Sequence, residues 1–417
     1  MKPRFAGEAR PIRVPVFRLG LMAAALTVSI SLFAATALAD HRSRETGCAG
    51  NPAVAAIPFQ FIGGHLFTQA MLNGKGPFLF VVDTGGVNLV TPALETALSL
   101  TNTGEERGHG VGPKTVESGE ANVARIKLGP AAFENQKFYV YPLEKLYAIG
   151  GVRMQGMVGN EIFRHYVTQI DYRAHMIRLI NRSGFDARLC GTPIPLTAAD
   201  SEMHIPASFD GIPGTFVIHS GSGAALDLST PFAVVHQLRS QFPNGLATVS
   251  SGVGGASRSY TVRGRNLQIG RFVIAHPIVS FSTAQTGALS RKDIAGEIGN
   301  GVWKRFLLTF DFAGKALYLE PRDQSEPLDA YDRSGMSLVV DPADFRIVAV
   351  ANGTPAEQAG LKVGDVVVAI NGKPAKSIAL PDLRQRLRNN PVGTLVAIEV
   401  IRDGRKKTAG LVLRNLL

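Results

Sequence analysis

Residues 77–86 read PFLFVVDTGG, and residues 213–222 read PGTFVIHSGS. In both stretches a proline lies six residues before a polar residue, which is Asp83 in the first stretch and His219 in the second. Three apolar residues precede that position, and a hydroxyl residue and a glycine follow it. A short apolar run between proline and glycine predicts a buried strand that ends in a tight turn. The same strand and loop therefore occur twice.

A second pair of matching segments lies downstream of each stretch. A Gly-Asn pair at residues 159–160 precedes Asp171, and a Gly-Asn pair at residues 299–300 precedes Asp311 at the same spacing. The separation between the two Gly-Asn pairs is also nearly equal to the separation between Asp83 and His219. Two matched anchors at a nearly constant offset indicate a tandem duplication.

Each copy also contains a glycine-rich turn between its two anchors. Residues 108–113 read GHGVGP in the first copy, and residues 252–255 read GVGG in the second. In both copies a β-like run follows and ends in a Leu-Gly or Ile-Gly turn. These patterns predict hairpins, and hence two lobes built mainly of β-strands.

The pattern changes after the second copy. Residues 321–333 are polar and contain two prolines, which predicts a linker. Glycine-bounded apolar segments follow, and residues 381–389 predict a helix that has proline at its start and Leu383 and Leu387 four residues apart. A separate C-terminal domain is expected here.

The N-terminal segment, residues 1–39, has the composition of an export signal. Basic residues up to Arg18 precede an uncharged stretch, residues 19–39, which ends in Ala-Leu-Ala before Asp40. This order predicts cleavage before Asp40 and a periplasmic or secreted protein. The apolar stretch is also long enough to span a bilayer if it stays uncleaved, so a membrane anchor is the alternative.

Composition excludes several other classes of function. The chain has a net charge of +11, but its densest basic segments, residues 384–388 and 402–407, contain no aromatic residues, so no nucleic-acid partner is expected. Its nine histidines show no metal-ligand spacing and there is no Cys-x-x-Cys, so neither a metal nor another cofactor is expected. The nucleophile motif Gly-x-Ser-x-Gly is also absent from the sequence.

The Asp-Thr-Gly at residues 83–85, at the end of an apolar strand, suggests acid–base hydrolysis. Gly85 allows a close approach of the next turn, and Thr84 can hydrogen-bond within the loop network. When two carboxylates meet in such a cleft they share one proton. One of them then activates a water molecule while the other protonates the peptide carbonyl.

Together, these motifs resemble the retropepsin/pepsin clan of aspartic proteases, in particular bacterial exported aspartyl proteases with a C-terminal PDZ domain. The resemblance covers residues 52–417 and implies a mainly β fold with two tandem lobes, a cleft that binds peptide or unfolded-protein substrates, and aspartic-type endopeptidase activity. It also implies that segments 157–159 and 297–299 cross beneath the catalytic loops. The implied site residues are Asp83 and His219 as the catalytic pair, Thr84, Gly85, Ser220 and Gly221 in the active-site loops, and Gly110 and Gly112 in a flap.

The chain departs from this family at His219, where the second lobe should supply an aspartate. Three interpretations follow. Asp83 and a neutral His219 form a working acid–base pair, since imidazole exchanges a proton near pH 7. Alternatively, the site is inactive and the cleft only binds peptide, as in a pseudoprotease. In the third interpretation the first lobe pairs with a second copy of itself in a homodimer. Asp227 is a conceivable substitute carboxylate, but a surface or structural role is favoured.

The C-terminal domain resembles PDZ domains of exported bacterial proteases. The resemblance assigns Gly335, Met336, Ser337 and Leu338 to a loop that binds the C-terminal carboxylate of a partner protein. The peptide would then pair with the next strand. Leu383 and Leu387 would line the side-chain pocket, although Leu387 could equally be a core residue.

Two cysteines, Cys48 and Cys190, complete the sequence expectations. In an exported chain they suggest one disulfide, with two free thiols as the alternative. The expected divisions are a signal peptide at 1–39, a first lobe at 40–190, a second lobe at 191–322, a linker at 323–334 and a PDZ domain at 335–417.

Overall fold

The computed structural model describes residues 53–417, apart from residues 111, 113, 200–201, 323–328 and 343. The predicted signal peptide and Cys48 lie outside the described residues. Cys190 is disulfide-bonded. Within the described ranges, no helix combines the length and the apolar character needed to cross a bilayer.

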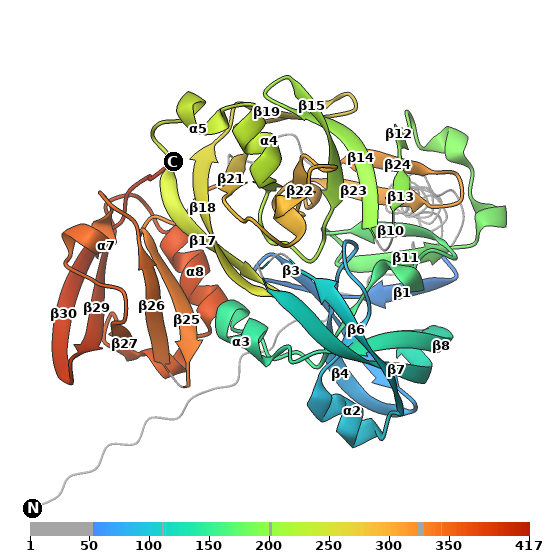
Figure 1. The fold of residues 1–417 in the computed structure, drawn as a ribbon, viewed down its shortest axis with the longest axis horizontal. Helices are drawn as coiled ribbons and strands as arrows, with labels where there is room; N and C mark the ends of the chain where they lie inside the picture. The colour runs from blue at the N-terminus through green and yellow to red at the C-terminus, as the bar shows by residue number, and fades with distance from the viewer. Residues whose placement is uncertain (1–52, 111, 113, 200–201, 323–328, 343) are drawn as a thin grey trace, which may run out of the picture. The chain divides into compact units, whose positions relative to one another are not determined.

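The first lobe is an eight-stranded sheet (Figure 1). Its strands, in spatial order, are β2 (Gln60–Ile62), β3 (His65–Leu72), β4 (Lys75–Val82), β9 (Gly156–Val158), β5 (Leu89–Val90), β8 (Ala131–Val140), β7 (Thr115–Leu128) and β6 (Asn102–His109). Helix α2 (Pro92–Leu98) begins with proline at its first turn, and Thr91 caps it by accepting a hydrogen bond from Leu94 N. Helix α3 (Glu144–Gly150) follows β8.

The second lobe repeats this arrangement in a larger sheet. Its strands, in spatial order, are β17 (Leu246–Gly252), β18 (Gly255–Arg263), β21 (Ile278–Ser282), β16 (Leu226–Leu228), β22 (Gly296–Ile298), β15 (Ile212–Ile218), β14 (Glu202–Phe209), β19 (Asn266–Ile269) and β20 (Phe272–Ala275), with β13 (Thr197–Ala199) beside β14. Short helices α4 (Thr230–Val235), α5 (Leu238–Gln241) and α6 (Asn300–Trp303) connect them.

The duplication is visible in the strand pairing. In the first lobe β4 pairs parallel with β9, β9 antiparallel with β5, and β5 parallel with β8. In the second lobe β15 pairs parallel with β22, β22 antiparallel with β16, and β16 parallel with β21. The predicted fold class, two tandem β lobes of the aspartic-protease type followed by a PDZ domain, is confirmed.

A third sheet joins the two lobes. It contains, in spatial order, β1 (Ala55–Pro58), β11 (Met176–Ile180), β10 (Val167–Asp171), β23 (Phe306–Asp311), β24 (Ala316–Pro321) and β12 (Ile194–Pro195). The central pair, β10 and β23, comes from different copies and runs antiparallel. Asp171 and Asp311 end these two strands, and their carboxylates pair with Arg322 and Arg182 respectively. Their predicted structural role agrees with these contacts.

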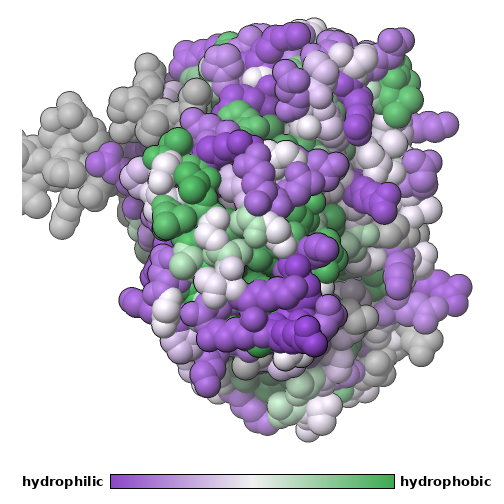
Figure 2. Space-filling model, turned by 90° about the vertical axis from the view of Figure 1, so that its left-hand side faces the viewer, coloured by the Kyte–Doolittle hydropathy of each residue, from purple (hydrophilic) through white to green (hydrophobic). Residues whose placement is uncertain are grey.

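The C-terminal PDZ domain has a sheet and a hydrophobic core of its own. Its sheet contains β25 (Met336–Asp341), β26 (Asp344–Val350), β27 (Val366–Ile370), β29 (Leu395–Arg402) and β30 (Arg405–Val412), with β28 (Lys373–Pro374) beside β27. Helices α7 (Pro355–Gln358) and α8 (Leu380–Asn389) accompany the sheet. On the β29–β30 hairpin the cross-strand partners Leu395 and Val412 are exposed. Figure 2 shows a face on which apolar residues form a band between polar ones.

Two details of the predicted PDZ ligand site differ in the structure. Strand β25 already begins at Met336 and is bulged between Ser337 and Leu338, so most of the predicted carboxylate loop belongs to a strand. Gly335 alone precedes the strand, with a φ of +79°. Leu383 and Leu387 are 1% and 2% exposed and pack in the core, because the helix must cover the sheet with its apolar face. Both leucines are therefore core residues.

The predicted linker is only partly described. Residues 323–328 lie outside the described ranges. In the remainder, Asp329 is held by the second lobe, since its carboxylate lies 2.7 Å from Lys304 Nζ and 3.1 Å from Arg305 Nη2. The described half of the linker is therefore fixed to the protein surface.

Candidate active site

Asp83 and His219 occupy equivalent positions at the ends of two central strands. Asp83 follows β4, and its N–H donates to Val158 O over 2.9 Å. His219 follows β15, and its N–H donates to Ile298 O over the same distance. The two side chains face each other across the lobe interface, with His219 Nε2 3.4 Å from Asp83 Oδ1. The structure therefore brings together the two residues that the repeat predicted.

The loops that carry these side chains are tied to each other by reciprocal hydrogen bonds. Thr84 N donates to Ser220 Oγ over 2.9 Å, and Ser220 N donates to Thr84 Oγ1 over 3.0 Å. Each hydroxyl also donates to the strand of the other lobe, Thr84 to Ile218 O and Ser220 to Val82 O. Thr84 and Ser220 are 3% and 1% exposed, so this double link lies in a dry environment where each bond is stronger than in water.

Glycines allow the two loops to approach this closely. A Cβ on Gly221 would lie 2.3 Å from Asp83 Cγ, and one on Gly85 would lie 3.1 Å from His219 Cδ2. The backbone N–H groups of both glycines donate to Asp83 Oδ1, over 2.9 Å from Gly85 and 3.2 Å from Gly221. The glycine of each loop therefore makes room for the functional side chain of the other.

Glu297 completes the site and was not predicted to take part in it. It lies in the centre of β22, and its Oε2 is 2.7 Å from His219 Nδ1. The equivalent position of the first copy is Met157, so the sequence does carry a signal: a charged residue replaces an apolar one in a buried segment. Its partner depends on the parallel pairing of β15 with β22, which only the structure shows.

The charges of these three residues set the protonation of His219. Burial lowers the pKa of His219, but the carboxylates of Asp83 and Glu297 outweigh burial and hold that pKa well above its usual value. Burial raises the pKa of Asp83, yet the charge and hydrogen bond of His219, with the two backbone donors, bring it below its usual value. These directions favour a protonated His219 between two carboxylates, whereas the first interpretation from the sequence took His219 as neutral.

Asp227 is partly exposed and is the cross-strand neighbour of Glu297. It sits on β16 directly across from Glu297 in the antiparallel register, and its Oδ2 is 3.5 Å from Ser222 Oγ. Burial, together with the negative charge of Glu297, raises the pKa of Asp227 to about 7. Asp227 therefore lies next to Glu297 and Ser222, and these contacts favour the structural role.

The two glycine-rich hairpins meet at their tips. Gly110 and Gly112 lie at the tip of the β6–β7 hairpin, and Val253 and Gly254 form the tip of β17–β18. Gly112 N donates to Val253 O over 2.8 Å, and Lys114 N donates to Gly254 O over 3.1 Å. Each lobe therefore contributes one hairpin to this backbone contact. The sequence predicted a flap on the first lobe only.

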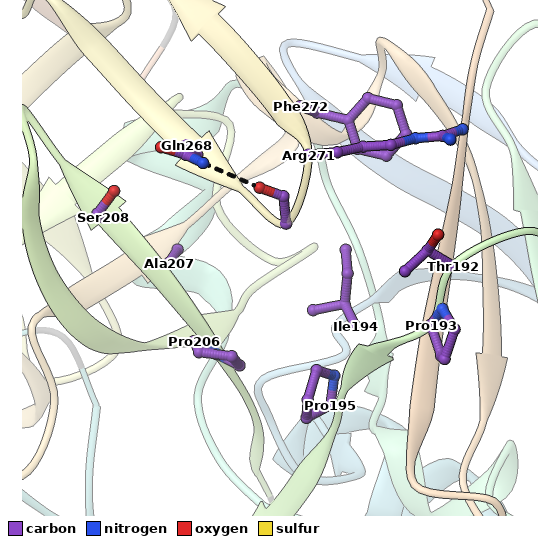
Figure 3. Close-up of a pocket in the computed structure, with 11 residues that line it drawn as sticks. Thr192, Pro193, Ile194, Pro195, Pro206, Ala207, Ser208, Gln268, Arg271 and Phe272 are labelled. Atoms are coloured by element: carbon purple, nitrogen blue, oxygen red, sulfur yellow. Dashed lines mark hydrogen bonds between the residues drawn. The ribbon is translucent and has the colours of Figure 1, made fainter.

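A cavity of about 310 Å³ lies elsewhere in the second lobe (Figure 3). It is lined by Pro193, Pro195, Pro206, Arg271 and Phe272, among others, and by no acidic residue or histidine. Such a lining offers no acid–base pair. Among the described residues no group of three or more His, Cys, Asp or Glu side chains is arranged to hold a metal ion.

Comparison with known protein families finds matches to two segments of the chain. Residues 68–162 match the model of a family described as aspartyl protease, and residues 346–402 match that of the PDZ domain. The chain thus carries an N-terminal protease-like domain and a C-terminal PDZ domain.

Curated relatives are similar over short segments. Serine protease Do-like HtrB of Bacillus subtilis is 35% identical over 94 residues, which is 22% of this chain and 20% of that protein. Periplasmic serine endoprotease DegP of Escherichia coli is 37% identical over 66 residues, which is 16% of this chain and 14% of that protein. A probable DegP-like endoprotease of Rhizobium meliloti is 28% identical over 123 residues, 30% of this chain and 22% of that protein. The chain thus spans at most 22% of the length of these three relatives. These similarities support a PDZ-containing protease. They do not determine its catalytic class, which has to be inferred from the residues of the site.

Proposed function

We propose that the protein is an aspartic-type endopeptidase that cleaves peptides and unfolded protein segments, with Asp83 and His219 as its catalytic pair. The observation that carries this proposal is the 3.4 Å approach of His219 Nε2 to Asp83 Oδ1 across two interlocked loops. Each lobe supplies one member of the pair, and the first lobe matches the aspartyl protease family.

The protonation of the pair assigns the two roles. Asp83, an ionised carboxylate, takes a proton from the attacking water, and protonated His219 donates from Nε2 to the peptide carbonyl oxygen. In a two-carboxylate site the proton is donated by a protonated aspartate. In the proposed pair, protonated His219 takes the place of that aspartate.

The named relatives are serine proteases, but the chemistry of this site supports a different class. Both ring nitrogens of His219 face carboxylates, so neither is free to take a proton from a serine. The adjacent Ser220 donates its hydroxyl proton to Val82 O. A serine nucleophile would need that proton directed at a base.

The PDZ domain and the predicted export signal support proposals about the partner and the location of the protein. We propose that the PDZ domain binds the C-terminus of a partner protein along β25, which is an edge strand of its sheet. We also propose a periplasmic location, which is supported by the predicted signal at residues 1–39 and by the periplasmic relatives. An uncleaved signal would instead anchor the protein in the membrane.

Cleavage of an unfolded protein by the purified mature chain tests the proposed function. A statine-type peptide should inhibit cleavage, Asp83→Asn should abolish it, and Asp186→Asn should leave it unchanged because Asp186 forms an exposed ion pair with Arg188. Inhibition by a serine-directed phosphonate would overturn the aspartic class. If the parent binds peptide without cutting it, the non-catalytic peptide-binding function is correct. Asp83-dependent cleavage that survives His219→Ala would instead support the homodimer.

A further inference from the structure

The proposed function does not explain how the His219 ring is oriented, and Glu297 makes the shorter of the two contacts to that ring. We propose that Glu297 is a positioning residue, whose carboxylate holds the ring by Nδ1 so that Nε2 is directed at Asp83. This inference rests on the proposed function for its catalytic meaning. The orientation of the ring can nevertheless be measured without any substrate.

Glu297 is itself held rigidly. It is 4% exposed and lies in β22 between β15 and β16, with backbone pairing on both sides. A Cβ on the preceding Gly296 would lie 2.2 Å from Asp227 O. Strands β22 and β16 therefore approach each other so closely that only glycine fits at this position. The next residue, Ile298, accepts a hydrogen bond from Trp303 Nε1 over 2.6 Å. A carboxylate on this strand therefore has little freedom to leave the ring.

Four titratable groups surround His219, and each comes from a different element. Asp83 follows β4 and faces Nε2, while Glu297 on β22 faces Nδ1. Asp227 on β16 lies behind Glu297, and His65 on β3 interacts with both Asp83 and His219. Burial lowers the pKa of His65, so this second imidazole adds little positive charge. Of these groups, Glu297 alone is placed to fix Nδ1.

The contrast between the two copies supports this role. Behind Asp83 the first copy has Met157, whereas behind His219 the second copy has Glu297. Asp83 is oriented by backbone donors from Gly85 and Gly221. An imidazole has two nitrogens and a ring that can turn, so its orientation depends on the hydrogen bond that its other nitrogen makes. A carboxylate is therefore required on the histidine side and not on the aspartate side.

Nitrogen-15 NMR of histidine-labelled mature protein tests the positioning role directly. The His219 signals are identified by their loss in His219→Asn. In the parent, His219 should stay doubly protonated above the usual histidine pKa of about 6.5, with its Nδ1 proton protected from exchange. A parent His219 that titrates near the usual value, or an unprotected Nδ1 proton, overturns the proposal even without any variant.

The decisive variant is Glu297→Gln, which keeps the shape and removes the charge. It should lower the pKa of His219 by about 1 to 3 units, a tenfold or larger change in proton affinity. The matched control is Glu202→Gln, because Glu202 contacts His204 over 3.0 Å in the same lobe. The control should alter the His204 signals and leave those of His219 unchanged. An unchanged His219 pKa in Glu297→Gln refutes the positioning role.

Kinetics then separate this inference from the proposed function. If the parent cleaves peptide, Glu297→Gln should lower kcat with little change in KM, and the loss should deepen as the pH rises and His219 loses its proton. If the parent does not cleave but Glu297→Gln still shifts His219, the positioning role stands and the proposed function fails. If the parent cleaves and Glu297→Gln changes neither the His219 signals nor kcat, the proposed function stands and the positioning role fails.

Discussion

At the scale of single residues, the site depends on which groups hold protons. Asp83 contributes stabilisation that is present above its unfolded pKa of about 3.9 and is lost as the pH falls through its lower folded pKa. His219 contributes stabilisation that is present below about pH 6.5 and is lost as the pH rises through its higher folded pKa. The ionised Asp83 and protonated His219 therefore coexist between those two folded pKa values.

Activity should follow this window, with a plateau that extends through neutral pH. The acidic limb should lie below the usual aspartate pKa, and the alkaline limb well above the usual histidine pKa, because these are the directions of the two shifts. A pH profile of kcat/KM on a peptide substrate measures both limbs. An alkaline limb near pH 6.5 would contradict a protonated His219.

Restoring an aspartate at position 219 should require a second change. In His219→Asp alone, the new carboxylate would lie near Glu297 and Asp83, and three buried carboxylates repel one another. We expect this single variant to be less active than His219→Asp combined with Glu297→Gln, which leaves one carboxylate pair and a lower pH optimum. Parallel pH profiles compare the two variants. Equal activity would mean that the Glu297 carboxylate does not repel an aspartate at position 219.

At the scale of elements, the hairpin tips depend on glycine. A Cβ on Gly112 would lie 2.2 Å from Gly254 C. A residue larger than glycine at this position would therefore clash at the contact between the β6–β7 and β17–β18 hairpins. A Cβ on Gly108, in the same hairpin, would meet no atom within 4 Å. The two glycines therefore form a matched pair for substitution.

Gly112→Ala should separate the hairpin tips, whereas Gly108→Ala should leave them joined. The expected result is faster amide hydrogen exchange at Gly112 and Lys114, whose N–H groups otherwise donate across the contact, and a higher KM. Hydrogen-exchange mass spectrometry of the hairpin reports the separation. Retained protection in Gly112→Ala would show that the tips do not need this contact.

The sequence predicted some of these elements well and others poorly. The repeated apolar run before Asp83 and His219 identified β4 and β15, since a buried strand that ends in glycine has a strong local pattern. Glu297 was missed because its contact depends on which strands are neighbours. The start of β25 was misplaced because Gly335 and Met336 suit either a loop or a strand until the pairing with β26 is known.

At the scale of the whole molecule, the two lobes share one hydrophobic core and the PDZ domain has another. The shared core includes Phe80 of the first lobe and Trp303 of the second, both fully buried. Strands β10 and β23, from different copies, pair at the centre of the joining sheet. The lobes should therefore unfold together.

Trp303 is the only tryptophan, so its fluorescence reports the unfolding of the lobes. Phe80→Ala in the first lobe should destabilise the transition seen at Trp303 by about 3 to 5 kcal/mol. Ile398→Ala, an equally buried change in the PDZ core, should leave that transition in place. Urea unfolding followed by fluorescence measures both variants. If Phe80→Ala has no effect at Trp303, the lobes are independent.

The presence of both halves of the site in one chain has a genetic consequence. In a protease assembled from two identical subunits, one mutation changes both sides of the site at once, because a single gene encodes them. Here each side is encoded by its own codons, so the second copy can carry His219 and Glu297 while the first copy carries Asp83 and Met157. Internal duplication thus opens evolutionary routes to a catalytic pair of two unlike residues.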